Sequence, residues 1–140
     1  MDCVESAFNV TLHTADMLIQ NDTIEIKEED GKRVEIFQVD YDLDREFIII
    51  NLNSGLSAGK KYFITIRYTA HLRDSLKGFY RSVYKDRSSG EDQDEYLGVT
   101  QFQATDARRA FPCFDEPALK ATYQVRIPKS QLTNNKLPLG

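Results

Sequence analysis

The sequence predicts an all-β fold, with about eight short strands at the spacing typical of an antiparallel sandwich. Apolar residues recur at every second position in several segments, and no long stretch has the spacing of a helix. Turn-forming pairs such as Asp30-Gly31 separate these segments. The chain has 140 residues, 41% of them hydrophobic, which is enough for one domain with its own core.

The clearest predicted strand covers residues 62–72, where one side is apolar and the other more polar. Its apolar side consists of Tyr62, Ile64, Ile66, Tyr68, Ala70 and Leu72. Residues 23–27 and 34–39 also alternate, and Asp30-Gly31 lies between them. Because Asp-Gly supplies the positive φ angles of a tight turn, we expect these two segments to form an antiparallel hairpin.

The other strands are predicted at residues 8–13, 47–52, 78–84, 97–102 and 121–127. Turn chemistry at Asn53-Ser54-Gly55 is expected to end the strand at 47–52. Residues 85–95 are polar and are predicted to form a solvated loop. Only residues 105–111 resemble a helix, a short helical turn that Pro112 ends. We therefore expect one β-domain over residues 1–127 and an irregular tail over residues 128–140.

Charge and hydropathy argue against several classes of partner. The chain carries 18 Lys and Arg against 22 Asp and Glu, a net charge of −4, with the two signs mixed. This is not the basic field of a protein that binds nucleic acid. The longest aliphatic run, residues 47–50, is far shorter than the ~20 residues of a membrane helix. The N-terminus has no secretory signal, so we expect either an intracellular protein or a chain whose true beginning lies upstream.

The cysteines and histidines lack the spacing of a metal site. Cys3 and Cys113 lie far apart without a CxxC or Cys/His pattern, and are expected to be buried small hydrophobes. His13 and His71 are the two imidazoles, and neither begins an HExxH helix. We expect both on strand surfaces and no zinc site within this chain.

Asp115 and Glu116 are adjacent carboxylates, but neighbours in an extended chain point in opposite directions and cannot share one substrate proton. A structural role is favoured, in which one of them pairs with Arg108 or Arg109. The acidic residues 28–30 are interpreted as a solvated loop, because they lack the ligand spacing of a calcium site.

Two N-glycosylation sequons begin at Asn9 and Asn21. They have meaning only for a chain that enters the secretory pathway, and chance could produce two in a chain of this length. If the chain enters that pathway, Asn9 and Asn21 are candidate glycosylation sites.

Residues 100–122 are the most specific feature of the sequence. They read TQFQATDARRAFPCFDEPALKAT, with a predicted helical turn and a proline on each side of residues 113–116. This segment resembles the late first-domain signature of the zinc aminopeptidases of the aminopeptidase N and puromycin-sensitive type. Residues 78–82, GFYRS, and residues 56–62, LSAGKKY, resemble two further strand motifs of that family. The resemblance covers residues 8–127.

The resemblance implies a saddle-shaped β-domain that packs against a thermolysin-like catalytic domain carrying the zinc. The edge of the β-domain closes one wall of the substrate pocket. In this family a Gln or Glu of the TQ-x-[QE]-A strand contacts the N-terminal residue of the peptide substrate, and Gln103 occupies that position here. Without the resemblance, Gln103 would be expected only to satisfy neighbouring backbone groups.

The sequence lacks both catalytic motifs of that family, GxMEN and HExxH. No cofactor is therefore expected in this chain, and zinc is expected in the full-length enzyme. The first strands of the family's domain also have no counterpart, so we expect a fragment, a truncated gene model or a splice product that does not hydrolyse peptides alone. The family implies the plasma membrane, the extracellular space or the cytoplasm, depending on the subfamily.

Two other functions compete with a peptidase fragment. The main alternative is a stand-alone, non-catalytic β module that binds peptides or proteins. An adhesion-type sandwich without a peptidase connection is disfavoured by residues 100–122. A transcript that continues into GxMEN and HExxH would favour the peptidase, whereas stable monomeric folding of the 140 residues would favour the module.

Overall fold

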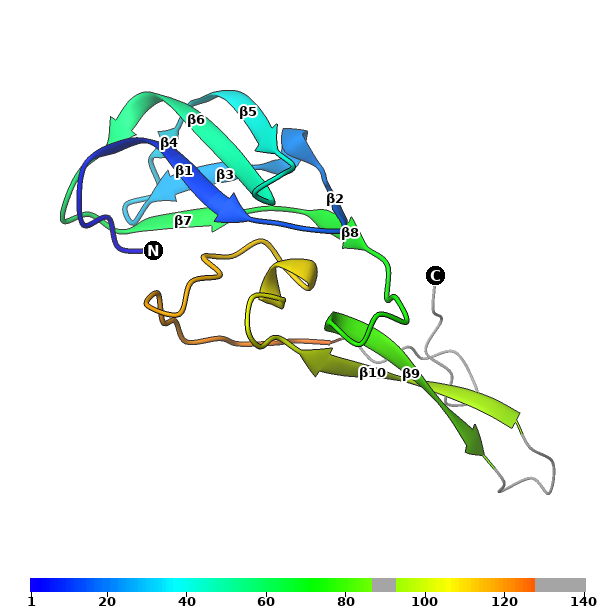
Figure 1. Cartoon of the computed structure of the whole chain (residues 1–140). Coiled ribbons are helices and arrows are strands. Elements are labelled where there is room, and N and C mark those ends of the chain that lie inside the picture. Colours follow the sequence, from blue (N-terminus) through cyan, green and yellow to red (C-terminus); the bar gives the residue numbers. More distant parts are fainter. Residues whose placement is uncertain (87–92, 128–140) are drawn as a thin grey trace.

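Figure 1 shows a computed structural model of the chain, which describes residues 1–86 and 93–127. The fold is all-β, as the sequence predicts. Its elements are β1 (Ala7–His13), β2 (Met17–Ile19), the 3₁₀ helix η1 (Asn21–Thr23), β3 (Glu25–Glu28), β4 (Arg33–Val34), β5 (Ile36–Asp42), β6 (Phe47–Leu56), β7 (Tyr62–Thr65), β8 (Tyr68–Ala70), β9 (Gly78–Asp86), β10 (Gln93–Gln101) and the 3₁₀ helix η2 (Ala107–Arg109). Within the described residues, no helix has the length and apolar character needed to cross a membrane.

Two three-stranded antiparallel sheets form a sandwich. One has the order β1-β6-β5 and the other the order β4-β3-β7. Between them lies one apolar cluster, in which Ile26, Ile48 and Ile50 are fully buried. The cluster is completed by Cys3, Val10, Leu12, Ile24, Val34, Leu52, Leu56 and Tyr62. Because both sheets contribute to it, removal of this apolar surface from water holds the sheets together.

The predicted hairpin around Asp30-Gly31 is confirmed in its first part. β3 pairs with β4, with Ile26 opposite Val34. Gly31 has a φ of 90°, and the Asp30 carboxylate accepts a hydrogen bond from the backbone of Lys32. The chain then changes sheets, since β5 pairs with β6 instead of β3. The predicted strand at 34–39 is therefore divided between the two sheets.

The single long strand predicted at residues 62–72 is wrong, because the chain opposite it is interrupted. β7 pairs with β3, β8 pairs with β2, and η1 separates those two partners. At the break, the Arg67 carbonyl accepts a hydrogen bond from the Gln20 N–H, and the Arg67 N–H donates to Thr23 Oγ1. Alternation in one segment cannot reveal an irregularity in its partner.

The end predicted for the strand at residue 52 is also wrong, because β6 continues through Asn53-Ser54-Gly55 to pair Leu56 with Ala7. A Cβ on Gly55 would lie 3.2 Å from the Phe8 ring and 3.3 Å from the Ala7 carbonyl oxygen. The glycine therefore allows two strands to approach closely and does not mark a turn.

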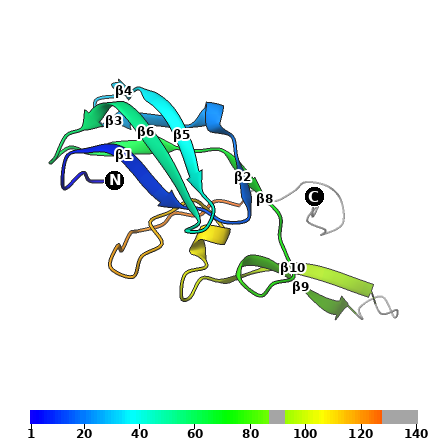
Figure 2. The same ribbon diagram turned by 45° about the horizontal axis from the view of Figure 1, so that its top comes forward.

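β9 and β10 form a separate antiparallel hairpin that projects away from the sandwich (Figures 1 and 2). The predicted loop at residues 85–95 is wrong at both ends, which belong to these strands. Lys85 and Asp94 form a cross-strand ion pair of 2.5 Å. Polar residues suit this hairpin because a two-stranded sheet leaves both faces accessible to such pairs. Residues 87–92 of the predicted loop lie outside the described residues.

After β10 the chain returns beneath the sandwich and passes through η2 (Figure 1). η2 confirms the short helical turn predicted within residues 105–111. The strand predicted at residues 121–127 is wrong, since no described segment pairs with it and Tyr123, Val125 and Ile127 are exposed. A strand needs a partner for its backbone groups as well as an alternating sequence. The irregular tail predicted at 128–140 lies outside the described residues.

Replacement of Ile50 by alanine tests the core. We expect Ile50→Ala to lower the free energy of unfolding by roughly 2–5 kcal/mol, because it leaves a cavity between the sheets. The matched control is Ile49→Ala, on the half-buried opposite face of β6, which should cost less. Urea denaturation followed by circular dichroism measures both changes, and equal losses would contradict this account of the core.

Candidate functional site

Gln103 lies in a tight loop, residues 102–106, between β10 and η2. The Asp106 N–H closes the loop by donating to the Phe102 carbonyl at 3.0 Å. The Gln101 side chain donates to the Gln103 carbonyl at 3.3 Å, and the Gln103–Ala104 peptide bond is cis. The Gln103 side chain is exposed, and its amide has no hydrogen-bond partner among the described residues. Its donors and its acceptor are therefore available to a ligand.

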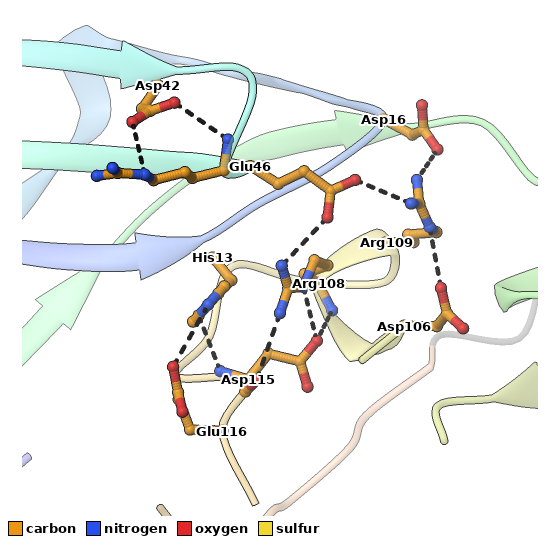
Figure 3. Close-up of polar contacts among 10 residues, drawn as sticks. His13, Asp16, Asp42, Glu46, Asp106, Arg108, Arg109, Asp115 and Glu116 are labelled. Atoms are coloured by element: carbon orange, nitrogen blue, oxygen red, sulfur yellow. Dashed lines mark hydrogen bonds and ion pairs between the residues drawn. The ribbon is translucent and has the colours of Figure 1, made fainter. Parts of the chain in front are cut away.

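Arg108 binds the segment that follows η2 and connects it to the sandwich. Its Nε and its backbone N–H both donate to Asp115 Oδ2, at 2.9 and 3.2 Å (Figure 3). Its Nη1 reaches Glu46, which lies in the turn before β6, at 3.1 Å. Only 11% of the Arg108 side chain and 10% of the Asp115 side chain are exposed, so the pair is largely desolvated. The predicted pairing of an acid in this segment with one of the two arginines is confirmed.

Arg109 binds three carboxylates from three different segments (Figure 3). Its Nε donates to Asp106 at 3.1 Å, one terminal nitrogen donates to Asp16 at 2.5 Å, and the other donates to Glu46 at 2.9 Å. Although burial acts to lower the pKa of Arg109, its hydrogen bonds to Asp106 and Asp16 and the charge of Glu46 raise it. Glu46 therefore bridges both arginines, one through each carboxylate oxygen.

Asp16 and Glu46 belong to turns of the sandwich, between β1 and β2 and between β5 and β6 respectively. Each has a φ of 58°, in the left-handed region that a residue such as Glu rarely adopts. Figure 3 shows both carboxylates directed at Arg109. The two turns and η2 thus meet at one charged cluster.

His13 is buried at the end of β1, so the predicted place on a strand surface is wrong for it. Its backbone exchanges two hydrogen bonds with Cys113, which extends β1 by one bridge. Its Nδ1 accepts a hydrogen bond from the Asp115 N–H at 3.2 Å, and its Nε2 lies 3.8 Å from Glu116. The ring packs edge-on against Phe47. His71 is exposed and lies outside the strands, so it too is not on a strand surface.

Both cysteines are free and buried, which confirms their prediction as small buried residues. Burial, followed by the charge of Asp115, raises the pKa of the Cys113 thiol to about 11. At neutral pH this thiol is protonated and is a poor nucleophile or metal ligand. Among the described residues, no group of three or more His, Cys, Asp or Glu side chains could hold a metal ion.

The base of the β9–β10 hairpin is packed against η2. A Cβ on Gly78, whose φ is 68°, would lie 2.6 Å from the Arg109 Cβ and 3.1 Å from the Asp106 carbonyl oxygen. Since real Cβ atoms do not approach so closely, the position requires glycine both for space and for its backbone conformation. β9 therefore contacts the base of the Gln103 loop directly.

The sequon residues lie elsewhere on the molecule. Asn9 is exposed in β1, and Asn21 is exposed in η1, where its Oδ1 accepts a hydrogen bond from the Tyr41 hydroxyl at 2.5 Å. The structure does not bring either asparagine into the charged cluster with Arg108 and Arg109.

Sequence reasoning missed Asp106 within the segment and three more distant members of this cluster, His13, Asp16 and Glu46. The contacts of these three distant residues with residues 108–115 span 62 to 102 positions along the chain. No local pattern indicates such partners. The contact between Arg108 and Asp115 spans only seven positions, which is why charge complementarity within one segment could indicate it.

The His13 contacts predict a pH dependence of stability. Burial, and then the charge of Arg108, lower the pKa of His13 below its usual value, against the opposing effects of Glu116, Asp115 and the Cys113 backbone. Because unfolded His13 binds a proton more readily than folded His13, the free energy of unfolding should fall as the pH drops from about 7 through 6.5, down to the lowered pKa.

We expect His13→Gln to reduce this slope in urea denaturation series between pH 7.5 and 5. His71→Gln, a change of the exposed imidazole, serves as the matched control and should keep the slope of the parent chain. An identical slope in His13→Gln and the parent would contradict the assignment of the slope to His13.

Residues 1–134 match the family model described as the peptidase M1 N-terminal domain. Aminopeptidase N of Bos taurus is 40% identical over 111 residues, covering 78% of this chain and 11% of that protein. Puromycin-sensitive aminopeptidase of Caenorhabditis elegans is 34% identical over 116 residues, covering 83% and 12%. Endoplasmic reticulum aminopeptidase 1 of Mus musculus is 44% identical over 86 residues, covering 60% and 9%. The chain thus spans only a small part of these relatives, and it belongs to the peptidase M1 N-terminal domain family.

Proposed function

We propose that this chain is the N-terminal domain of a zinc aminopeptidase, in which it forms one wall of the substrate pocket. Residues 1–127 act as one domain, and Gln103 contacts the N-terminal residue of the peptide. The observation that carries the proposal is the exposed, unpartnered Gln103 amide on a loop whose base is fixed by Asp106 and Arg109. The family membership of the chain supports the same reading.

The chemistry of Gln103 suits a free peptide N-terminus. An α-ammonium group has three donors and no acceptor, and the amide oxygen of Gln103 can accept one of them. A hydrogen bond that involves a charged group contributes about 1.5–3 kcal/mol, enough to favour a peptide with a free amine over a blocked one. Phe102, the first residue of the loop, packs edge to face against Phe111, with ring centroids 5.8 Å apart, and Phe111 in turn contacts Tyr123. These rings give the loop an apolar flank.

The zinc that the family implies does not fit the residues that the structure describes. His13 is engaged by the backbone of Asp115, Cys113 is a protonated thiol, and the described residues offer no cluster of three metal ligands. In this proposal, zinc, its ligands and the activation of water belong to a catalytic domain of the full-length enzyme. The contribution of this chain is recognition and positioning of the peptide.

A second candidate function is a stand-alone module that binds peptides or proteins without catalysis. The apolar side chains of Tyr123, Val125 and Ile127 favour it, because they are exposed on a segment that alternates but has no strand partner among the described residues. In either case, passage through the secretory pathway would make Asn9 and Asn21 the proposed glycosylation sites, since both are exposed.

The purified 140-residue chain should release no fluorophore from aminoacyl substrates and should bind no stoichiometric zinc, because its sequence has no HExxH motif and its described residues hold no group of three metal ligands. Fluorescence assays with added zinc, together with elemental analysis, measure both properties. Hydrolysis that a chelator abolishes would contradict the assignment of catalysis to another domain.

Gln103→Ala tests the role in recognition in a complete peptidase that carries this domain. We expect kcat/KM for peptides with a free N-terminus to fall by roughly 10- to 100-fold, the loss of one hydrogen bond to a charged group. Gln20→Ala, the same change at an exposed position of the sandwich, should leave kcat/KM unaltered. If Gln103→Ala changes neither the kinetics nor the unfolding transition, Gln103 does not contact the substrate and the proposed role in recognition is wrong.

A further inference from the structure

We infer that Asp106 and Arg109 are positioning residues, which hold the loop bearing Gln103 at a fixed place on the sandwich. This inference rests on the proposed function of Gln103 as the group that meets the peptide N-terminus. In addition, this function depends on the ion pair between Asp106 and Arg109 at the base of the loop, and neither of these residues faces the peptide.

Asp106 closes the loop through both its backbone and its side chain. Its N–H donates to the Phe102 carbonyl at 3.0 Å, its carbonyl accepts from the Arg109 N–H at 3.2 Å, and its carboxylate accepts from Arg109 Nε at 3.1 Å. Only 14% of the Asp106 side chain is exposed. The last residue of the loop is therefore bound at three points, and two of them are on Arg109.

Arg109 transmits this restraint to the sandwich. Its two terminal nitrogens bind Asp16 and Glu46, which belong to two different turns of the sandwich. Asp16 is held in turn by Arg73 at 3.3 Å. Because a guanidinium is planar and its donors point in fixed directions, three simultaneous carboxylate contacts allow only one orientation of the side chain. The base of the loop cannot shift without breaking contacts to both turns.

The stem of Arg109 is fixed from a third side by β9. A Cβ on Gly78 would lie only 2.6 Å from the Arg109 Cβ. The backbone of Gly78 is therefore in direct contact with the side chain of Arg109. In contrast, Gln103 is exposed and its amide is unpartnered among the described residues. The loop thus combines a rigid base with an exposed tip. Such preorganisation reduces the conformational entropy that a ligand contact would otherwise cost.

Arg108 is distinct from its neighbour in this respect. Its side chain binds Asp115 and Glu46, and none of its hydrogen bonds reaches residues 102–106. Two consecutive arginines therefore restrain two different segments, and the inference applies to Arg109 and Asp106 alone.

The first experiment uses the 140-residue chain itself. We expect Asp106→Ala to accelerate amide hydrogen exchange in residues 102–111 by about tenfold, while exchange in β1 and β6 stays unchanged. Asp74→Asn is the control, since Asp74 forms an exposed ion pair with Arg81 and does not contact the loop. Asp106→Asn, which keeps the shape of the side chain, provides a milder variant in case Asp106→Ala lowers overall stability. Unchanged exchange in residues 102–111 of both Asp106 variants would overturn the inference, whatever the function of Gln103.

The second experiment places Gln103→Ala, Asp106→Ala and the double variant in a complete peptidase that carries this domain. A positioning residue acts through Gln103, so we expect Asp106→Ala to raise KM about tenfold alone and to have no further effect beside Gln103→Ala. Asp106→Asn should restore part of the loss. Additive effects would overturn the inference. If Gln103→Ala alone changes nothing, the proposed function fails, and the exchange experiment separately decides whether Asp106 orders the loop.

Discussion

The pairing of Arg108 and Arg109 with carboxylates of other segments is the interaction that fixes the chain after β10 to the sandwich. The apolar core lies between the two sheets of the sandwich, and after β10 the buried residues within the described chain are Arg108 and Cys113. Segment 102–116 therefore has little apolar surface with which to hold its place. Removing one partner from a largely buried ion pair leaves an uncompensated charge, which is strongly unfavourable. Ion pairs therefore hold this segment in place, whereas burial of apolar surface holds the two sheets of the sandwich together.

This division explains which parts of the fold the sequence could predict. The β3–β4 hairpin follows from Asp30-Gly31 and local alternation, so it is predictable from a few residues. The break between β7 and β8 is not, because its cause lies in η1, more than forty residues earlier in the chain. Likewise, the sequence of residues 121–127 alone cannot show that this segment lacks a strand partner among the described residues. Alternation shows that a segment is able to form a strand, whereas pairing depends on the segments that lie next to it in the fold.

The same reasoning applies to the candidate site. Only the resemblance of its motif singles out Gln103 as a candidate, because an exposed glutamine has no distinguishing pattern of its own. The contact of Arg108 with Asp115 was predictable because both lie in one short segment. Glu46 could not be identified from its surroundings, since it resembles an ordinary acid in a polar turn until the fold places it between two guanidinium groups. The residues that support the Gln103 loop are therefore harder to predict than Gln103 itself.

A charged base suits a recognition loop better than an apolar one would. Apolar contacts tolerate small displacements, whereas a guanidinium shared among Asp16, Glu46 and Asp106 satisfies all three carboxylates in one geometry. A residue that recognises a peptide terminus beside a reacting centre must hold its position closely, because a misplaced contact loses its effect on the reaction. In the proposed function, the rigid base of the loop presents Gln103 to a peptide N-terminus whose hydrolysis another domain carries out. Under the proposed function, the ion pairs at the base of the loop are therefore as necessary for recognition as Gln103 at its tip.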